Sequence, residues 1–392
     1  MSIWIFFVFL CGIQSGYTQF TILIERDTTS FLVVSPFGKD TLDPEDFVTT
    51  YDSFPDADAI IVKEGCQIIG KYGGIKKEVY RRTHILREGG LESANITFTY
   101  NKYRKSLDYI FARTQNLEGD SVIWTEVGEE DYFTDESSDG EAKISFAFPK
   151  ARIGSIIDIA YGFTDKQQFY QSWTFQNEYP TLTSTFDVRE SSLLRYNFYF
   201  QGSFKENLQK GRSDNRTVFV MKDIPPIREE PYVPCPTDYF PKVILQVSNV
   251  GIEGSEAYEQ SSEFLNQDWQ SFSTSFQKNK STSYYRNKSK GLYKKVFPDL
   301  QEESDLKKKL EIIYERVRDH VRWNGSYSMA ASDKVTKLYK REVANSGEIN
   351  QLLIYFLRQA GLDVKPMLIA TRTFGDPFQE FPMRNQFNTL VA

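Results

Sequence analysis

Ser346 stands where a catalytic nucleophile would be sought in this 392-residue sequence. From Ser346 onwards, apolar residues recur every three or four positions up to Gly361, which predicts a helix that starts at Ser346. A cysteine at a helix N-terminus is activated because the helix dipole stabilises its thiolate. A serine hydroxyl needs a base within hydrogen-bond reach instead. We therefore interpret Ser346 as the N-cap of this helix, with Glu348 as an acid in its first turn.

The chain has two histidines, His84 and His320, so any pairing of serine or cysteine with histidine must use one of them. His84 lies in an arginine-rich predicted strand and is expected on the surface or opposite a neighbouring strand. His320 lies near the end of a predicted helix, where a structural role beside the helix dipole is expected. Two histidines also exclude a histidine-rich metal site, so we expect no metal and no cofactor.

Three cysteines are present, and Cys11 falls in an apolar N-terminal run. Removal of that run would leave Cys66 and Cys235. A disulfide between them is compatible with an oxidising compartment, but isolated cysteines are also common as small buried hydrophobic residues. The sequence leaves both interpretations open.

The remaining composition excludes several function classes. The formal net charge of −6 is dispersed and the basic runs are short, which argues against nucleic acid as a partner. Glycines near Gly73 do not precede a predicted helix, so there is no phosphate-binding loop. Glu129 and Glu130 lie in a stretch, Glu129 to Glu141, that we interpret as a solvated acidic loop, and they do not resemble the carboxylate pair of a glycosidase.

Alternating apolar and polar residues predict a long series of strands before residue 250. Because no helical pattern separates most of them, an antiparallel β-sandwich-like arrangement is expected there. The predicted strands are Ala59–Val62, Glu78–Arg87, Ala94–Tyr100, Tyr109–Gln115, Ser121–Val127, Lys143–Phe148, Ser155–Phe163, Leu193–Phe200, Thr217–Met221 and Val243–Val247.

Helical patterns dominate the last third of the chain. Trp269 is predicted as a buried anchor in a mixed polar region. A helix is predicted from Ser304, with one apolar stripe that faces a core. The stripe contains Leu306, Leu310, Ile313, Tyr314, Val317 and Val321.

The first residues indicate export. An apolar run from Ile3 to Ile13 is too short to span a bilayer as a helix and is followed by small and polar residues. We interpret residues 1–19 as a cleaved signal peptide without an acyl anchor, since bulky Leu10 precedes Cys11. No transmembrane helix is expected after cleavage.

Several phrases, in order along the chain, resemble a known family. They are PFG (36–38), YDSFPDADA (51–59), WTFQ (173–176), VRWNG (321–325), NSGEINQLL (345–353), AGL (360–362), ATR (370–372) and FN (387–388). The chain thereby resembles exported bacterial proteins that join domain of unknown function 3857 to a transglutaminase-like domain.

The resemblance implies a papain-like fold for the second half, with a cysteine at a helix N-terminus, a histidine on a later strand and an aspartate on the next strand. At the matching positions this chain has Ser346 for the cysteine and Thr389 for the histidine. The aspartate strand would lie beyond Ala392, which suggests a chain incomplete at its C-terminus. The resemblance therefore implies a degenerate site with no catalytic residues.

Together these observations predict an α+β multidomain fold, in which antiparallel β-sandwich-like domains precede a partial papain-like α+β domain. We expect a signal peptide (1–19), an irregular segment (20–54), a β-rich first part of domain 3857 (55–180), a second β block (181–250), a mixed connecting region (251–300) and a truncated transglutaminase-like domain (301–392).

The expected function is non-catalytic binding or scaffolding in the periplasm or at the cell envelope, with an unidentified protein, peptide or glycan as partner. One alternative is a transglutaminase, peptidase or amidase that acts on peptide or cell-wall material. Another is a carbohydrate-binding β-sandwich module, for which the 23 tyrosines and five tryptophans supply enough aromatic side chains.

Overall fold

The structure is a computed structural model that describes residues 42–392 except 72–73, 138–139, 167–169, 191–193, 229–230, 234, 251–267, 287–290, 380 and 384–385. The predicted signal peptide and most of the predicted irregular segment lie outside the described residues. The described parts of Met1–Arg228 and Tyr239–Glu259 form one compact unit, and those of Glu229–Asp238 and Gln260–Ala392 form a second.

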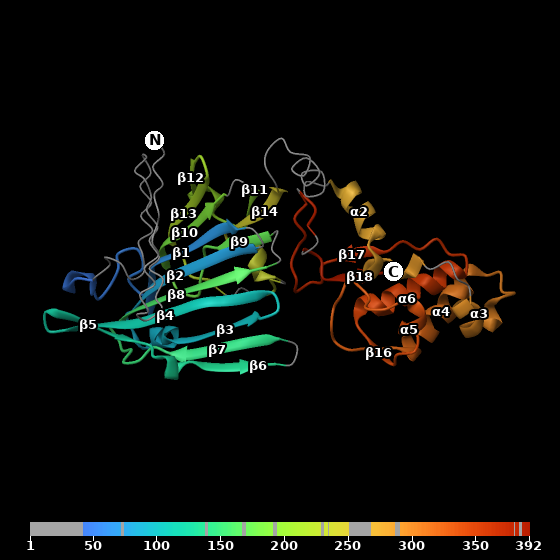
Figure 1. The fold of residues 1–392 in the computed structure, drawn as a ribbon, viewed down its shortest axis with the longest axis horizontal. Coiled ribbons are helices and arrows are strands. Elements are labelled where there is room, and N and C mark those ends of the chain that lie inside the picture. The colour runs from blue at the N-terminus through green and yellow to red at the C-terminus, as the bar shows by residue number, and fades with distance from the viewer. Residues whose placement is uncertain are drawn as a thin grey trace, which may run out of the picture. The chain divides into compact units, whose positions relative to one another are not determined.

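The first unit is built around an eight-stranded sheet with the order β12-β13-β10-β1-β2-β8-β4-β5 (Figure 1). Neighbouring strands are antiparallel except β1 and β10, which are parallel. The strands are β1 (Ala59–Lys71), β2 (Gly74–Ile85), β4 (Lys105–Glu118), β5 (Ser121–Glu126), β8 (Ile156–Asp165), β10 (Thr181–Arg189), β12 (Gln209–Ser213) and β13 (Arg216–Ile224).

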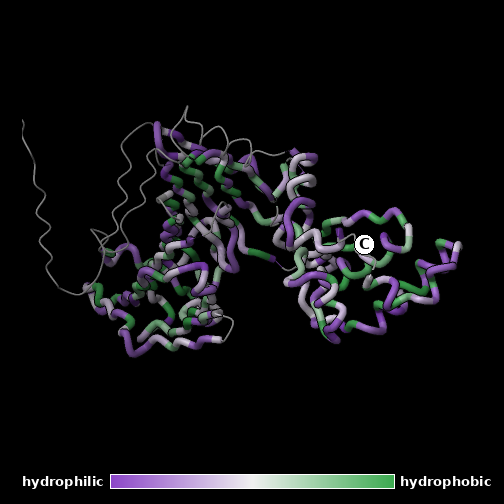
Figure 2. The backbone as a smooth tube through the Cα atoms, turned by 45° about the vertical axis from the view of Figure 1, so that its right-hand side comes forward, coloured by the Kyte–Doolittle hydropathy of each residue, from purple (hydrophilic) through white to green (hydrophobic). Residues whose placement is uncertain are grey.

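Two smaller antiparallel sheets complete this unit. One has the order β3-β7-β6, from Asn95–Asn101, Glu141–Ala147 and Phe133–Glu136. The other has the order β11-β14-β9, from Leu194–Gln201, Lys242–Val250 and Tyr170–Thr174. Hydrophobic and hydrophilic stretches alternate along many of these strands (Figure 2), as expected for sheets with one face on a core.

A charged cluster is buried between three strands of the large sheet. Asp158 on β8 is fully buried and accepts hydrogen bonds from Arg82 on β2 and Arg113 on β4, with N–O distances of 2.7–3.1 Å. Gln115 donates a further bond of 2.9 Å to the same carboxylate. Buried charges of this kind require partners, so the cluster constrains the register of these strands.

The second unit is mainly helical. Its helices are α2 (Trp269–Lys278), α3 (Gly291–Val296), α4 (Leu306–His320), α5 (Val335–Leu338) and α6 (Ser346–Gln359). Short strands pair as β15 (Arg322–Trp323) with β16 (Val343–Ala344), in parallel, and as β17 (Met367–Ile369) with β18 (Thr389–Val391), antiparallel. Helix α6 supplies much of the core, including Leu352, Ile354, Tyr355 and Phe356. No described helix is both long and apolar enough to cross a bilayer.

Short 3₁₀ helices connect these elements. They are Pro44–Asp46, Glu88–Ala94, Glu129–Asp131, Lys205–Asn207, Pro236–Asp238, Lys280–Thr282, Tyr284–Arg286 and Pro298–Leu300.

The predicted α+β multidomain class is confirmed, with a β-rich part followed by a helical α+β part. The predicted strands are present, and several are longer than their alternating cores. The acidic stretch from Glu129 was wrongly interpreted as loop throughout, because Phe133–Glu136 pairs with β7 and gains backbone hydrogen bonds there.

Two predictions of burial were wrong. Trp269 is 40% exposed, because it begins α2, and its indole nitrogen donates to the Gln379 carbonyl. Only part of the stripe on α4 faces the core: Ile313, Val317 and Val321 are buried, whereas Leu306, Leu310 and Tyr314 are 42–53% exposed. The apolar stripe is therefore wider than the surface that the rest of this unit covers.

Candidate functional site

The N-terminus of α6 is capped by Asn345, so the prediction that Ser346 is the N-cap was wrong. The Asn345 side chain accepts a hydrogen bond of 2.9 Å from the Glu348 amide, and Glu348 accepts one of 3.2 Å from the Asn345 amide. This reciprocal pair is a capping box. Ser346 is the first residue of the helix, and its hydroxyl is available for contacts outside it.

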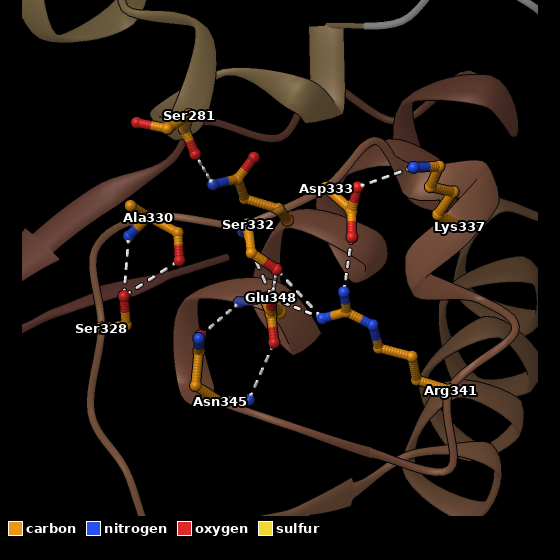
Figure 3. A network of polar contacts seen from close by, with 10 residues as sticks. Ser281, Ser328, Ala330, Ser332, Asp333, Lys337, Arg341, Asn345 and Glu348 are labelled. Atoms are coloured by element: carbon orange, nitrogen blue, oxygen red, sulfur yellow. Dashed lines mark hydrogen bonds and ion pairs between the residues drawn. The ribbon is translucent and has the colours of Figure 1, made fainter. Parts of the chain in front are cut away.

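Glu348 also anchors the loop that faces the helix N-terminus (Figure 3). It is 4% exposed, and its carboxylate accepts from the amide and hydroxyl of Ser332 and from Arg341. Burial alone would raise the pKa of Glu348, but hydrogen bonds from Ser332 and Asn345 and the charge of Arg341 hold it below its usual value. With its oxygens engaged, Glu348 is a structural support of the site.

The Ser346 hydroxyl lies 2.7 Å from the Thr389 hydroxyl on β18. It also accepts a hydrogen bond of 2.9 Å from the Ser328 amide. Thr389 is buried and Ser346 is partly buried. The structure therefore brings together the two positions that the family resemblance assigns to a nucleophile and its base, although 43 residues separate them.

The motif around Asn388 helps to position β18. The Asn388 side chain donates 2.8 Å to the Thr371 hydroxyl and accepts 2.9 Å from the Thr371 amide. These bonds join the residues just before β18 to those that follow β17, which pairs with it. Two phrases of the resemblance, at 370–372 and 387–388, thus meet at the strand that carries Thr389.

Two hydroxyl groups at this distance can exchange a hydrogen bond, but neither can act as a general base near neutral pH. Of the two histidines, His320 places Nε2 2.6 Å from the Tyr339 carbonyl and stacks on the Tyr339 ring. This structural contact at the end of α4 agrees with its predicted role. Neither histidine contacts Ser346.

The surface position considered for His84 was wrong, whereas the cross-strand alternative is confirmed, because His84 lies opposite Ile60 on β1 and Ile156 on β8. The His84 ring is fully buried, and Nδ1 lies 3.0 Å from the Tyr51 hydroxyl. Burial lowers the pKa of His84 to about 4 and raises that of Tyr51 to about 12. Both groups are therefore neutral near pH 7, and one hydrogen bond joins the phenol to the imidazole.

Cys66 and Cys235 are free thiols, each buried in a different compact unit. Burial raises the pKa of the Cys66 thiol to about 12, so this group is not a reactive thiolate. Among the described residues, no group of three or more histidine, cysteine or acidic side chains is placed to hold a metal ion.

An exposed aromatic pair next to Ser346 was missed by the sequence analysis. Trp323 and Tyr327 are each 50% exposed, with ring centroids 5.1 Å apart. The Trp323 indole donates to the Ser326 carbonyl, which also accepts from the Ser346 amide. The sequence VRWNG at 321–325 drew attention to this region only because it resembles the family. A single tryptophan in a sequence does not show whether its side chain is exposed.

Comparison with family models finds the description "Domain of Unknown Function with solved-structure structure (DUF3857)" at residues 73–228. No curated protein matches the sequence at a significant level.

Among solved structures, the chain is similar to a protein from Parabacteroides distasonis ATCC 8503 that is provisionally described as a protease. The TM-score is 0.58 and the identity 13%, over 85% of this chain and 64% of that one. The chain thus spans less than two thirds of that protein's length. At this identity the likeness concerns the fold alone.

Two further similarities are too weak to support an argument. Aminopeptidase A from Legionella pneumophila has a TM-score of 0.27 and 8% identity, over 49% of this chain and 22% of that one. Leukotriene A4 hydrolase from Saccharomyces cerevisiae has a TM-score of 0.28 and 12% identity, over 58% and 37%. What the comparisons establish is a DUF3857 domain at residues 73–228.

Proposed function

We propose that this is an exported protein whose C-terminal part is a transglutaminase-like domain that has lost its catalytic pair and serves to bind or scaffold at the cell envelope. The observation that carries the proposal is the 2.7 Å contact between the Ser346 and Thr389 hydroxyls. This contact has the topology of a nucleophile and base, from a helix N-terminus and a strand, but contains no base.

The chemistry of the pair supports a non-catalytic role. A thiol at a helix N-terminus can ionise, but a serine hydroxyl starts at a much higher pKa and needs a neighbour that takes its proton. Thr389 cannot take that proton, and the Ser346 oxygen already accepts from the Ser328 amide. The capping box between Asn345 and Glu348 fixes the start of the helix but supplies no group that could activate the Ser346 hydroxyl.

A retained surface for a ligand favours binding over a purely structural role. Trp323 and Tyr327 present two half-exposed rings, tilted by 49° to each other, beside the helix N-terminus. Exposed aromatic side chains held by a hydrogen bond lose little conformational entropy when a ligand packs on them. Their partner would be a peptide or a glycan of the envelope.

The second candidate is a transglutaminase-, peptidase- or amidase-like enzyme. It is favoured by the structural likeness to a protein that is provisionally described as a protease. Under this alternative Ser346 would form an acyl-enzyme with a base supplied by another part of the protein.

A fluorophosphonate probe that labels activated serines separates the two candidates. We expect no labelling at Ser346, and the same background in wild type and Ser346→Ala. Mass spectrometry that finds the adduct on Ser346, together with its loss in the variant, would establish the enzyme instead. N-terminal sequencing of exported material should find a start near Phe20, which tests the signal peptide.

Restoring the missing groups tests whether the two positions form the family's pair. The double variant Ser346→Cys, Thr389→His should show a thiol whose pKa is lower than in Ser346→Cys, Thr389→Ala, because an imidazolium would stabilise the thiolate. Iodoacetamide alkylation against pH measures this pKa, with wild type as the background for Cys66 and Cys235. Equal pH profiles in both variants would show that the positions are not a catalytic pair.

A further inference from the structure

A cavity of about 650 Å³ lies within the first compact unit, apart from Ser346. Its volume falls in the range of about 300–1,000 Å³ that is typical of ligand pockets. One wall is a face of the large sheet, where Val79, Arg81 and Thr83 alternate along β2. These residues lie opposite Tyr161, Ile159 and Ile157 on β8, which line the same cavity.

This wall carries hydrogen-bond donors that have no acceptor among the described residues. Thr83 is 5% exposed, and its hydroxyl makes no hydrogen bond with another described residue. The Tyr161 hydroxyl likewise has no such partner in the described chain, and burial raises its pKa to about 12, so it keeps its proton. Neither hydroxyl is among the fully buried atoms that lack a partner, so both are accessible from the cavity and can donate to the carbonyl oxygens of a ligand.

Arg81 adds a third donor without adding net charge. Its Nε and Nη2 atoms donate to the buried Glu64 carboxylate at 3.1 and 2.9 Å, and Nη2 also donates to Asn177. Its Nη1 group has no hydrogen bond to a described residue. Because Glu64 neutralises the guanidinium, this wall is suited to carbonyl oxygens rather than to an anion.

Another part of the lining is acidic. Glu92 and Glu178 are exposed, and neither forms an ion pair with a described residue. Both lie near Tyr179, whose pKa is raised by burial and then by these two carboxylates. Their charge disfavours an anionic ligand and favours a neutral or basic one.

The lining of the cavity also includes part of β3, from Asn95 to Phe98. In its sheet β3 is an edge strand, paired only with β7 among the described strands. An edge strand presents unpaired backbone groups to which an extended chain can add. Ile96 and Phe98 of β3, with Ile157 and Ile159, provide apolar lining for a side chain.

We propose that this cavity binds an extended peptide segment with basic residues that aligns with β3 and inserts an apolar side chain between β3 and the large sheet. Its carbonyl oxygens accept from Thr83, Tyr161 and Arg81, and its basic groups pair with Glu92 and Glu178. The aliphatic lining favours this occupant over a neutral oligosaccharide. The inference is independent of the proposed function, because Ser346 and Thr389 belong to the other unit.

The test measures fluorescence anisotropy of labelled hexapeptides with the full chain. Lysine alternates with valine, leucine or phenylalanine in one set, and glutamate replaces lysine in the matched set. We expect at least one basic peptide to bind, and its glutamate counterpart to bind at least about tenfold more weakly. The loss of one hydrogen bond in Thr83→Val or Tyr161→Phe should weaken binding by about three- to tenfold.

Matched controls are Thr134→Val and Tyr103→Phe, which alter exposed side chains outside the cavity and should leave binding unchanged. The double variant Glu92→Gln, Glu178→Gln should reduce the ratio of the affinity for the lysine peptide to the affinity for the matched glutamate peptide. Bound peptide should also slow amide exchange across Asn95–Asn101. The proposal is overturned if no basic hexapeptide binds, if cellohexaose displaces the peptide, or if Thr83→Val binds like wild type.

Discussion

At the start of α6, the adjacent residues Asn345 and Ser346 have different roles. Asn345 closes the helix through its side chain and Ser346 directs its hydroxyl to Thr389. A capping residue is confined to one geometry by the helix amides, whereas the next residue points its side chain away from them. The Ser346 hydroxyl therefore takes no part in capping and contacts Thr389, while Asn345 stabilises the start of the helix.

Substitution at these two positions should have unequal effects on stability. Asn345→Ala removes the cap and should lower the free energy of unfolding by about 0.5–2 kcal/mol. Asn345→Asp, which keeps an acceptor, should restore most of that loss. Ser346→Ala removes no cap, but it removes the hydrogen bonds of the Ser346 hydroxyl with the Ser328 amide and with Thr389, each worth about 0.5–1.5 kcal/mol net. Urea denaturation measures all three, and Asn345→Ala equal to wild type would contradict the assigned cap.

His84 should make stability depend on pH. Its pKa is about 4 in the folded chain and 6.5 in the unfolded chain, so between these values the unfolded chain binds more protons. Stability should therefore fall as the pH drops from 6.5 to 4, with a slope of up to about 1.4 kcal/mol per pH unit from this residue.

The check is His84→Phe, which removes the titrating group and keeps an aromatic ring. The difference in unfolding free energy between wild type and variant should change across that pH window and level off above it. Parallel curves for the two proteins would show that His84 is not buried in its neutral form.

At the scale of elements, α4 shows how an apolar stripe can exceed the core. Ile313 and Val317 are buried in the core to which α6 contributes. Leu310 and Tyr314 lie beside them around the helix and are exposed to solvent. Helix periodicity identifies the hydrophobic side but not its buried width, which depends on the neighbouring elements.

Two substitutions on α4 should separate these faces. Ile313→Ala should cost about 2–5 kcal/mol, because it leaves a cavity among fully buried side chains. Leu310→Gln, on the exposed face, should change the free energy of unfolding by about 0.5 kcal/mol or less. Chemical denaturation compares them, and equal losses would show that the whole stripe is covered.

At the scale of the whole molecule, the described chain divides into two compact units with separate means of stabilisation. The first contains buried ion pairs across a large sheet, as at Asp158, and the second contains a helical core around α6. Units with their own cores need not unfold together.

Thermal unfolding should therefore show two transitions in calorimetry. Asp158→Asn leaves two buried arginines without their carboxylate and should lower the free energy of unfolding of the first unit by about 3 kcal/mol or more. Only the transition of the first unit should then move to a lower temperature. Ile313→Ala should lower only the second. A single transition shifted by both variants would show that the units fold as one.

Much of this arrangement follows from local pattern. Alternation predicted the strands because one face of each meets a core, and the spacing from Ile349 to Leu357 predicted α6 for the corresponding reason. The scarcity of histidine limited the chemistry before any fold was considered, and the order of the family phrases assigned Ser346 and Thr389 as counterparts.

Other features depend on pairings that local pattern does not encode. The burial of His84, the convergence of Arg82 and Arg113 on Asp158, and the cavity beside β3 all require knowledge of which strands are neighbours. The contact between Ser346 and Thr389 requires the chain to return over 43 residues. By itself the sequence determined which residues stand at the two positions of the site. Only the tertiary structure decided that their hydroxyls meet, because contacts between distant segments are set by packing rather than by local periodicity.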